Sequence, residues 1–441
     1  MRTLAFAATG LLAAGLITAA PTHAAGETCQ GQAATVVGAP GQVGLTGTEG
    51  PDVIVTNGAL STRALGGADL VCFSGAESSG GTWLDAGAGD DVVDASASGT
   101  SVRVELGAGS DTYTGTAKDE DVRGGTLDPA TYATHDVERD VITTVAGGSD
   151  RVTSGSDRTV INTDVVVLGG GGFLSWTGPL GAGGRLDGGA AGGSTLAFTV
   201  GSGDVVVNAE AGTLSQDATQ LEWTGFDRFT TGGGSSRTPS SFRFLGTDRD
   251  EELTYDFPHA HRTVQHIDMG GGDDSLWLGD DNVGPAGSTY DGGSGTDHVA
   301  MWAGRTLDLD LATDRLVTRH KGRTRRSSLT GFDTQLVGAR HLVLAGTRKA
   351  EDLRFHACTA TVRGRGGADD IRHSRDNYFE GGLRCTPLAF RLYGGGGNDV
   401  LQGGRGDDLL VGGAGRDTVL GNVGRDRCSG EKVRACEVRL R

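Results

Sequence analysis

Aspartates recur at a fixed spacing near the C-terminus of this chain, and carboxylates at such a spacing can hold metal ions. Four consecutive nine-residue units run from Gly394 to Ser429, and each has an aspartate at its sixth position. These aspartates are Asp399, Asp408, Asp417 and Asp426. Carboxylate and carbonyl oxygens in a flexible loop suit Ca²⁺, which takes about six to eight oxygen ligands. The spacing therefore predicts a series of calcium sites with these aspartates as ligands.

Glycines and short apolar stretches in the same units indicate how the aspartates are positioned. The units read GGGGNDVLQ, GGRGDDLLV, GGAGRDTVL and GNVGRDRCS, with glycine first and fourth and an apolar residue eighth. Glycine accepts positive φ angles, so the first six residues can curl and turn carbonyls inward. The last three residues predict a short strand whose central side chain points into a thin core. Those side chains are Leu401, Leu410, Val419 and Cys428.

With these features, the units resemble the hemolysin-type, or RTX, calcium-binding repeat, which forms a right-handed parallel β-roll. The first three units match the repeat consensus, whereas the fourth has Asn422 for the second glycine and Cys428 for the aliphatic residue. Two units make one coil, so residues eighteen apart are expected to stack, Asp399 on Asp417 among them. The resemblance implies calcium ions between successive turns and a closing turn in the fourth unit. So strict a period is at odds with a flexible glycine-rich linker.

Partial copies of the unit occur far upstream of this block. They place an aspartate after a glycine and before an apolar residue, at Asp52, Asp91, Asp274, Asp297 and Asp369. Further shortened copies surround Asp111 and Asp150. A single such copy is also what a glycine–aspartate turn before a strand would look like. Together the copies predict one architecture throughout, with the first five aspartates as additional candidate calcium ligands.

Composition and periodicity favour an all-β solenoid. The chain has 441 residues, of which 78 are glycine and only 9 are proline, and 5% are aromatic. Such a chain suits coils that each bury a narrow strip rather than one large core. Short β-branched stretches alternate with glycine turns, and helical periodicity is almost absent. We therefore expect a right-handed parallel β-roll or β-helix built from glycine-rich repeats, with a β-sandwich as the alternative.

A longer period divides the chain into regions. The segment TGFD at 224–227 returns at 330–333, and GT at 246–247 returns at 346–347. These landmarks predict tandem copies at 186–290 and 291–393, each of about a hundred residues. Before them lies a degenerate solenoid, 25–185, and after them the calcium-binding roll with its disulfide cap, 394–441. The first copy has no aspartate that matches Asp297, so we expect no calcium there.

The first 24 residues predict a secretory signal peptide, because Arg2 precedes an apolar run that ends before Thr22-His23-Ala24. No other stretch approaches the roughly 20 apolar residues that a membrane-spanning helix needs. The net charge of −17 is unfavourable for nucleic-acid binding. We therefore expect a secreted protein without a membrane span in its mature form.

Six cysteines follow the signal segment, and an even number in an exported chain predicts disulfides. Six cysteines allow fifteen connectivities. Loop length favours pairing of nearest neighbours. The expected pairs are Cys29 with Cys72, Cys358 with Cys385, and Cys428 with Cys436.

Several familiar catalytic patterns are absent from the sequence. It has no His-Glu-x-x-His, no Gly-x-Ser-x-Gly and no phosphate-binding loop. A basic segment, 319–326, could hold a polyanion or simply be a solvated loop. Three histidines (His259, His261 and His266) are either a transition-metal site or loop residues.

The sequence thus predicts a secreted calcium-binding module with a structural or binding role and with folding coupled to calcium. Its expected partners are calcium ions and, beyond them, polymers of the cell surface or extracellular space. An extracellular polysaccharide-active enzyme, of lyase or epimerase type, on the central solenoid is the alternative. A parallel β-helix enzyme of that kind would need Arg, Lys, His or Tyr side chains gathered over a groove.

Overall fold

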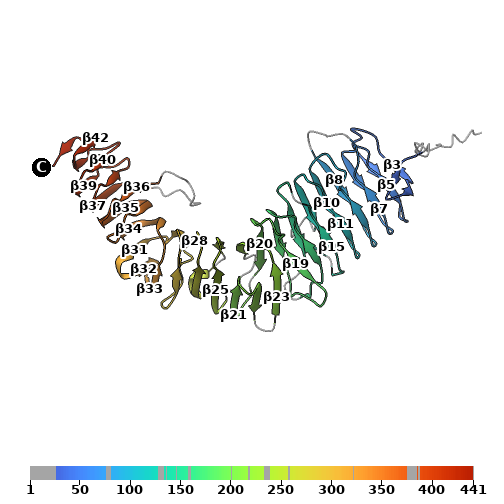
Figure 1. Ribbon diagram of the computed structural model, residues 1–441, viewed down its shortest axis with the longest axis horizontal. Coiled ribbons are helices and arrows are strands. Elements are labelled where there is room, and N and C mark those ends of the chain that lie inside the picture. Colours follow the sequence, from blue (N-terminus) through green and yellow to red (C-terminus); the bar gives the residue numbers. More distant parts are fainter. Residues whose placement is uncertain are drawn as a thin grey trace, which may run out of the picture.

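The chain forms a long, bent solenoid of short strands (Figure 1). The computed structural model describes residues 26–75, 81–127, 134–135, 137–145, 147–156, 160–199, 201–216, 219–232, 239–256, 259–320, 322–374, 385 and 388–440. These ranges contain no α-helix, and so none that could cross a membrane. The expected signal peptide, 1–24, lies outside the described residues. The all-β parallel solenoid predicted from the glycine-rich repeats is confirmed.

Two faces of parallel strands run along the solenoid, because each strand pairs mainly with strands of the coils before and after it. The first face contains, in spatial order, β3 (Val36–Val37), β5 (Val53–Val55), β7 (Leu70–Cys72), β9 (Val92–Asp94), β11 (Thr112–Thr114), β15 (Val141–Thr143), β17 (Val165–Val167), β19 (Arg185–Asp187), β23 (Thr219–Thr224), β22 (Thr213–Gln216), β21 (Asp204–Asn208), β25 (Ser241–Thr247), β27 (Val264–Gly270), β29 (Thr289–Asp291), β33 (Arg323–Thr330), β32 (Arg315–His320), β31 (Thr306–Asp310), the later parts of β34 (Thr334–Ala345) and β35 (Asp352–Gly366), β37 (Ala389–Gly396), β39 (Leu409–Ala414), β41 (Arg427–Ser429) and β43 (Val438–Arg439).

The second face contains β4 (Leu45–Thr46), β6 (Ser61–Arg63), β8 (Thr82–Asp85), β10 (Val102–Glu105), β12 (Glu120–Arg123), β16 (Arg151–Ser154), β18 (Phe173–Trp176), β20 (Thr195–Thr199), β24 (Arg228–Gly232), β26 (Glu252–Tyr255), β28 (Ser275–Asp280), β30 (His298–Trp302), the earlier parts of β34 and β35, β36 (Asp370–His373), β38 (Val400–Gln402), β40 (Thr418–Leu420) and β42 (Lys432–Arg434). Outside both faces lie the hairpins β1 (Thr28–Cys29) with β2 (Gln32–Ala33) and β13 (Thr126–Leu127) with β14 (Thr134–His135), and two short 3₁₀ turns, Ala260–Arg262 and Leu311–Thr313.

The core is a narrow strip between the two faces. Successive strand residues alternate between the interior and the surface, so a three-residue strand buries only its central side chain. In the C-terminal block, Leu401, Leu410, Val419 and Cys428 are all 0% exposed. The side chains predicted to point inward therefore do so, and each coil packs on its neighbours in register.

The rod bends where antiparallel strands are inserted into the first face. Between β19 and β25 this face gains the meander β23–β22–β21, and between β29 and β34 it gains β33–β32–β31. On the second face, β20 pairs directly with β24 and β30 directly with β34. Each meander places three strands where the second face has one, and two extra strands at about 4.8 Å each lengthen the first face by roughly 10 Å. This unequal length accounts for the bend in Figure 1.

The two meanders occupy equivalent places in the predicted tandem copies, 186–290 and 291–393. In each copy, a glycine of the TGFD segment has a positive φ angle, 72° at Gly225 and 76° at Gly331. The following phenylalanines, Phe226 and Phe332, are both buried. The same order of strands occurs twice, and the division into two copies with these boundaries stays a prediction.

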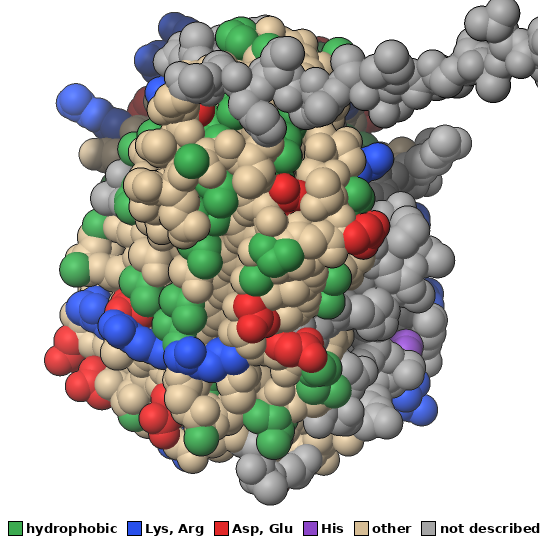
Figure 2. Space-filling model, turned by 90° about the vertical axis from the view of Figure 1, so that its right-hand side faces the viewer, with side chains coloured by type: hydrophobic (Ala, Val, Ile, Leu, Met, Phe, Trp, Pro, Cys, Tyr) green, Lys and Arg blue, Asp and Glu red, His purple; other side chains and the backbone are tan. Residues whose placement is uncertain are grey.

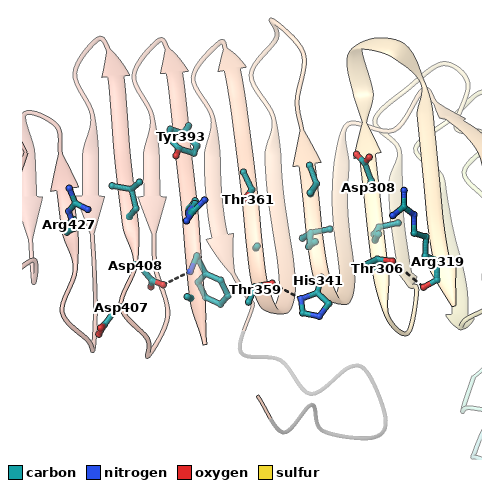
Figure 3. A pocket seen from close by; sticks show the side chains of 18 of the residues that line it. Thr306, Asp308, Arg319, His341, Thr359, Thr361, Tyr393, Asp407, Asp408 and Arg427 are labelled. Atoms are coloured by element: carbon teal, nitrogen blue, oxygen red, sulfur yellow. Dashed lines mark hydrogen bonds between the residues drawn. The ribbon is translucent and has the colours of Figure 1, made fainter. Parts of the chain in front are cut away.

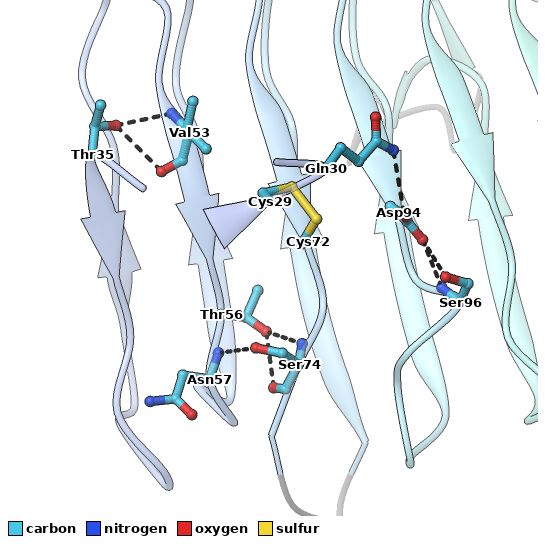
Figure 4. Close-up of a disulfide and its surroundings, with 10 residues drawn as sticks. All are labelled: Cys29, Gln30, Thr35, Val53, Thr56, Asn57, Cys72, Ser74, Asp94 and Ser96. Atoms are coloured by element: carbon cyan, nitrogen blue, oxygen red, sulfur yellow. Dashed lines mark hydrogen bonds between the residues drawn. A yellow bond between two sulfur atoms is a disulfide. The ribbon is translucent and has the colours of Figure 1, made fainter. Parts of the chain in front are cut away.

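Disulfides tie down the solenoid at three places, and all three expected pairs are confirmed. Cys29 and Cys72 join the β1–β2 hairpin to β7 with a Cα–Cα distance of 5.5 Å (Figure 4). Next to this link, the side-chain amide of Gln30 donates to Asp94. The other pairs are Cys358 with Cys385 and Cys428 with Cys436. The hairpin thereby covers part of the first coils, and the view onto this end shows backbone and uncharged side chains with a row of Lys and Arg and several acids in its lower half (Figure 2).

Candidate calcium sites

An acidic residue stands directly before many of the strands, and these residues stack from coil to coil. The backbone N–H of Asp399 donates to Oδ1 of Asp417 at 3.0 Å. The N–H of Asp408 donates in the same way to Oδ1 of Asp426 at 2.9 Å. Each carboxylate therefore uses one oxygen to cap the turn of the preceding coil. The predicted stacking of aspartates eighteen residues apart is confirmed.

This acid ladder continues beyond the C-terminal block. In the N-terminal half, the N–H of one acid donates to the carboxylate of the next through Asp52, Asp69, Asp91, Asp111, Asp140 and Asp164. On the other edge it links Glu251, Asp274, Asp297 and Asp333, and then Glu351, Asp369, Asp399, Asp417 and Glu431. A shorter ladder joins Asp408, Asp426 and Glu437. All nine aspartates predicted as calcium ligands thus belong to a ladder.

The second carboxylate oxygen is the atom that a cation could use. In most of the predicted ligands this oxygen is buried and accepts no hydrogen bond from any described residue. The oxygens concerned are Oδ2 of Asp91, Asp274, Asp297, Asp369, Asp399, Asp417 and Asp426. A buried anionic oxygen without a donor is strongly unfavourable, so a positive ion at these positions would fit.

Glycine five residues before the acid makes room for that oxygen. A Cβ at Gly394 would overlap Oδ2 of Asp399, and a Cβ at Gly412 would overlap Oδ2 of Asp417. The next glycines of these turns have the positive φ angles that the curled backbone requires, as with 115° at Gly395. Asn422, which replaces glycine in the fourth unit, also has a positive φ of 78°, so this turn keeps its shape. The glycine at the first position therefore leaves space for the carboxylate, and the glycine at the second position allows the positive φ angle of the turn.

Burial raises the pKa of the ladder acids, because a charged carboxylate loses its hydration there. It raises the pKa of Asp91 to about 7 and that of Asp274 to about 7, with neighbouring acids adding to the effect. The pKa of Asp369 is likewise raised to about 7 by burial and by the facing carboxylate of Glu351. Burial also raises the pKa of Asp297, Asp399 and Asp426. These groups therefore resist ionisation unless a cation compensates their charge.

Two of the predicted ligands have both oxygens satisfied by protein donors. Asp408 accepts from the backbone N–H of Phe390 at 2.7 Å and from that of Gly404 at 2.7 Å. Asp52 accepts from the Thr35 hydroxyl and, on its other oxygen, from the N–H and hydroxyl of Thr48. Donors thus already occupy directions that a cation would need. Asp52 and Asp408 are the weakest of the nine as calcium ligands, and the assignment stays a prediction for all nine.

The Thr48 arrangement recurs wherever the turn reads Gly-Thr-x-x-x-Asp/Glu. The hydroxyl of Thr247 donates to Glu251 and that of Thr347 to Glu351. In the turn at Gly115, the N–H of Thr116 donates to Glu120 at 2.6 Å. In these turns the threonine donates to the acid. At Asp52 and Glu251 both carboxylate oxygens are satisfied, whereas Glu120 and Glu351 keep one buried oxygen without a donor, as the open aspartate turns do. The solenoid therefore contains two chemically different kinds of acidic turn.

The position that matches Asp297 in the first tandem copy is occupied by Ser194. Asp333 donates its backbone N–H to the carbonyl of Asp297, and Asp227 donates to that of Ser194. The buried Ser194 hydroxyl donates to the carbonyl of Gly188 at 2.6 Å. A neutral serine thus fills this turn with an internal hydrogen bond, in keeping with the expectation that the first copy holds no calcium here.

Within the described ranges, no three His, Cys, Asp or Glu side chains come together as a ready-made metal cluster. Each candidate site supplies one or two carboxylates, so backbone carbonyls or water would provide the other ligands of a calcium ion. The histidine alternative is not supported, because His266 lies beside Thr289 and His261 beside Asp281. The chemistry of the donors is therefore that of a hard, oxygen-ligated cation.

Sequence reasoning missed several ladder members. Asp69 follows Gly67 and precedes a buried valine, so the shortened repeat pattern would have found it. Glu251 and Glu351 follow a Gly-Thr pair that was visible as a landmark of the tandem copies. Asp140 and Asp164 follow irregular connections and have only the pattern Asp-Val before a buried residue. A recognisable sequence pattern was thus present at Asp69, Glu251 and Glu351 but not at Asp140 and Asp164.

Comparison with protein families supports the assignment of the repeats. Residues 78–98 and 393–428 match the RTX calcium-binding nonapeptide repeat, in four copies. The matched residues include Asp91 and all four aspartates of the C-terminal block. A search of curated proteins found no match. The chain thus contains RTX-type calcium-binding nonapeptide repeats, and these repeats are built into a parallel β-solenoid.

Proposed function

We propose that the protein is a secreted, calcium-binding β-roll that serves as a structural or binding module outside the cell and completes its folding on calcium. The buried Oδ2 atoms of the ladder acids are the observation that carries this proposal. Calcium would neutralise carboxylates that the fold stacks together and removes from water. The residues would hold the ion between successive turns, and the ion would supply positive charge.

The proposed sites are the predicted aspartate turns whose Oδ2 is buried without a donor. The strongest are Asp399, Asp417 and Asp426, followed by Asp369, Asp297, Asp274 and Asp91. The turns at Asp52 and Glu251 are proposed to be independent of calcium, since protein donors occupy both oxygens of each acid. An affinity in the roughly 10⁻⁴–10⁻³ M range of extracellular modules would suit folding after export.

Export is supported by the predicted signal peptide and by the three disulfides, which form and persist in oxidising compartments. The disulfides form without the ladder acids, so they would hold neighbouring coils together before calcium binds. Folding in calcium-poor surroundings would be unfavourable, because the stacked acids repel one another. The combination suits a protein that matures after it leaves the cell.

The test is a calcium titration of the chelated mature protein, followed by far-UV circular dichroism. We compare it with Asp399→Ala/Asp417→Ala and with a control, Asn398→Ala/Arg416→Ala, which alters exposed neighbours in the same turns. The intact protein and the control are expected to gain β-structure with calcium, and the first variant to lose much of that gain. Absence of calcium binding by the intact protein would refute the proposal.

A further inference from the structure

A groove crosses the first face of the C-terminal half, over strands β31, β34, β35, β37 and β39 (Figure 3). Its volume is about 1140 Å³. Pockets for small molecules span about 300–1,000 Å³, so an elongated ligand fits this groove better than a compact one. Asp408 lines this groove and Asp426 lies between its residues Arg425 and Arg427, whereas the open turns at Asp369, Asp399 and Asp417 precede strands of the second face.

Small side chains form the floor of the groove. Thr306 lies beside His341, His341 beside Thr359, and Thr359 beside Ala389, one from each successive strand. A parallel row carries Val343, Thr361 and then Arg391. Apart from His341 and Arg391, these side chains are short, so the surface is hollow between bulkier residues at either end. The hydroxyls of the floor offer hydrogen bonds to a polar ligand along the solenoid axis.

Positive charge stands at both ends of this hollow. Arg319 from the β32 strand is at one end, and Arg391, Arg425 and Arg427 are at the other, all exposed. Among the described residues, these four arginines form no ion pair. Of the three acids in the groove, Asp308 is paired with Arg315 through two hydrogen bonds of 2.8 and 2.9 Å, while Asp407 and Asp408 accept backbone N–H groups and keep their charge. Free cations therefore outnumber free anions in this groove, although the whole chain has a net charge of −17.

The ligand class follows from charge and surface chemistry. A nucleic acid carries a negative charge about every 1.7 Å of duplex, and this acidic protein would repel so dense a polyanion along most of its length. Single strands also need several aromatic side chains on which bases stack, and only Tyr393 and His341 present rings at the surface of this groove. An acidic polysaccharide carries sparser charge and many hydroxyls. Arginines separated by threonines match that pattern.

We propose that this groove binds a linear acidic polysaccharide, whose carboxylates or sulfates pair with Arg319 at one end and with Arg391 and Arg427 at the other, while its hydroxyls contact the threonine floor. Arginine suits this role because its planar fork binds carboxylate and sulfate groups in a bidentate manner. The roll that forms one end of the groove is the proposed calcium module, so this inference rests on the proposed function. Calcium binding and glycan binding are measured separately.

The test uses the mature protein with its calcium-dependent β-structure verified by circular dichroism. Binding is followed by isothermal titration with hyaluronan oligosaccharides (carboxylate only) and chondroitin sulfate oligosaccharides (carboxylate and sulfate), with neutral chito-oligosaccharides and oligo-dT beside them. The acidic glycans are expected to bind, and salt is expected to weaken them because it screens the charges. The stronger of the two acidic glycans identifies the favoured charged group.

The decisive variant is Arg391→Gln/Arg427→Gln, with Arg405→Gln/Arg416→Gln as the matched control. The control removes two exposed arginines of the same roll that do not line the groove. We expect the groove variant to lose about tenfold or more in affinity, and the control to bind as the intact protein does. Equal loss in both variants, or no binding of either acidic glycan by a calcium-folded protein, would overturn the proposal. Tighter binding of oligo-dT through the same arginines would overturn it in favour of nucleic acid.

Discussion

Replacing Asp369 by asparagine should change stability in opposite directions with and without calcium. The side chain is 1% exposed, and its Oδ1 accepts from the N–H of Glu351 at 3.0 Å. Asparagine keeps this acceptor and nearly the same shape but removes the charge. Its amide can also donate toward Glu351, where the aspartate places a second negative group. The substitution therefore isolates the charge from the packing.

The magnitude follows from the pKa of Asp369, which burial and Glu351 raise from 3.8 to about 7. A raised pKa means that the folded state disfavours the ionised form. The fold therefore loses stability as the pH rises from the ordinary pKa of 3.8 to the folded-state pKa of about 7, and it stays weakened above that pH. The difference corresponds to roughly 4 kcal/mol at pH 8. In chelator, Asp369→Asn should accordingly raise the free energy of unfolding, up to this limit.

With calcium, the variant should instead have a lower free energy of unfolding than the intact protein. An ion that binds only the folded state stabilises it by about 2.7 kcal/mol at one hundred times its dissociation constant. Asparagine lacks the charge that attracts the ion, so the variant should lose most of that stabilisation. The assay is urea unfolding at pH 8, followed by circular dichroism, in chelator and in saturating calcium.

Asp370→Asn is the matched control, since Asp370 is the adjacent residue and forms a surface ion pair with Arg372. Such pairs contribute about 0–1 kcal/mol, so the control should change little and with the same sign in both buffers. If Asp369→Asn lowers stability in chelator by more than the control does, the reasoning on buried charge is refuted.

Three further predictions test the ladder. In chelator, acidification from pH 8 to about pH 5 should raise the melting temperature, because the folded-state pKa values of Asp91 and Asp274 (about 7) and Asp69 (about 6) exceed the unfolded value of about 4. In calcium, the same acidification should weaken ion binding, since protons compete; a melting temperature that falls on acidification in chelator would contradict this. Gly412→Ala should reduce calcium affinity because its Cβ would overlap Asp417 Oδ2, whereas Gly396→Ala has open space and should bind calcium normally in the same titration; equal affinities would argue against the glycine cradle. Thr347→Val should lower stability by about 1–3 kcal/mol in both buffers, because Glu351 loses a hydroxyl donor; a loss seen only with calcium would show that this turn binds the ion.

Local features of the sequence predicted the solenoid and its C-terminal sites well. The inward positions of Leu401 and Val419 follow from a strict nine-residue period, and one period fixes both turn and strand. The disulfide between Cys428 and Cys436 followed from short loop length alone. Such features depend on neighbours within one coil, where spacing in the chain translates directly into spacing in the fold.

Features that depend on coil length were harder to predict. The ladder steps from Asp52 to Asp69 over 17 residues but from Asp369 to Asp399 over 30, so no single period reveals the stack. The groove brings Arg319 and Arg427 onto one surface although they are far apart in the chain. The meanders that bend the rod likewise follow from strand pairing, which the sequence of each strand does not specify.

The acid ladder also has a polarity. Every linking hydrogen bond runs from an amide of one coil to a carboxylate of the next, and Glu431 and Glu437 receive the last of them. A coil that docks onto the N-terminal side of coils already folded finds the acceptor for its amide in place. A coil added at the opposite growing end would wait with an unmet amide until its successor arrived. The ladder thus favours zippering from the C-terminal coils backward, with the last turns as the template for those before them.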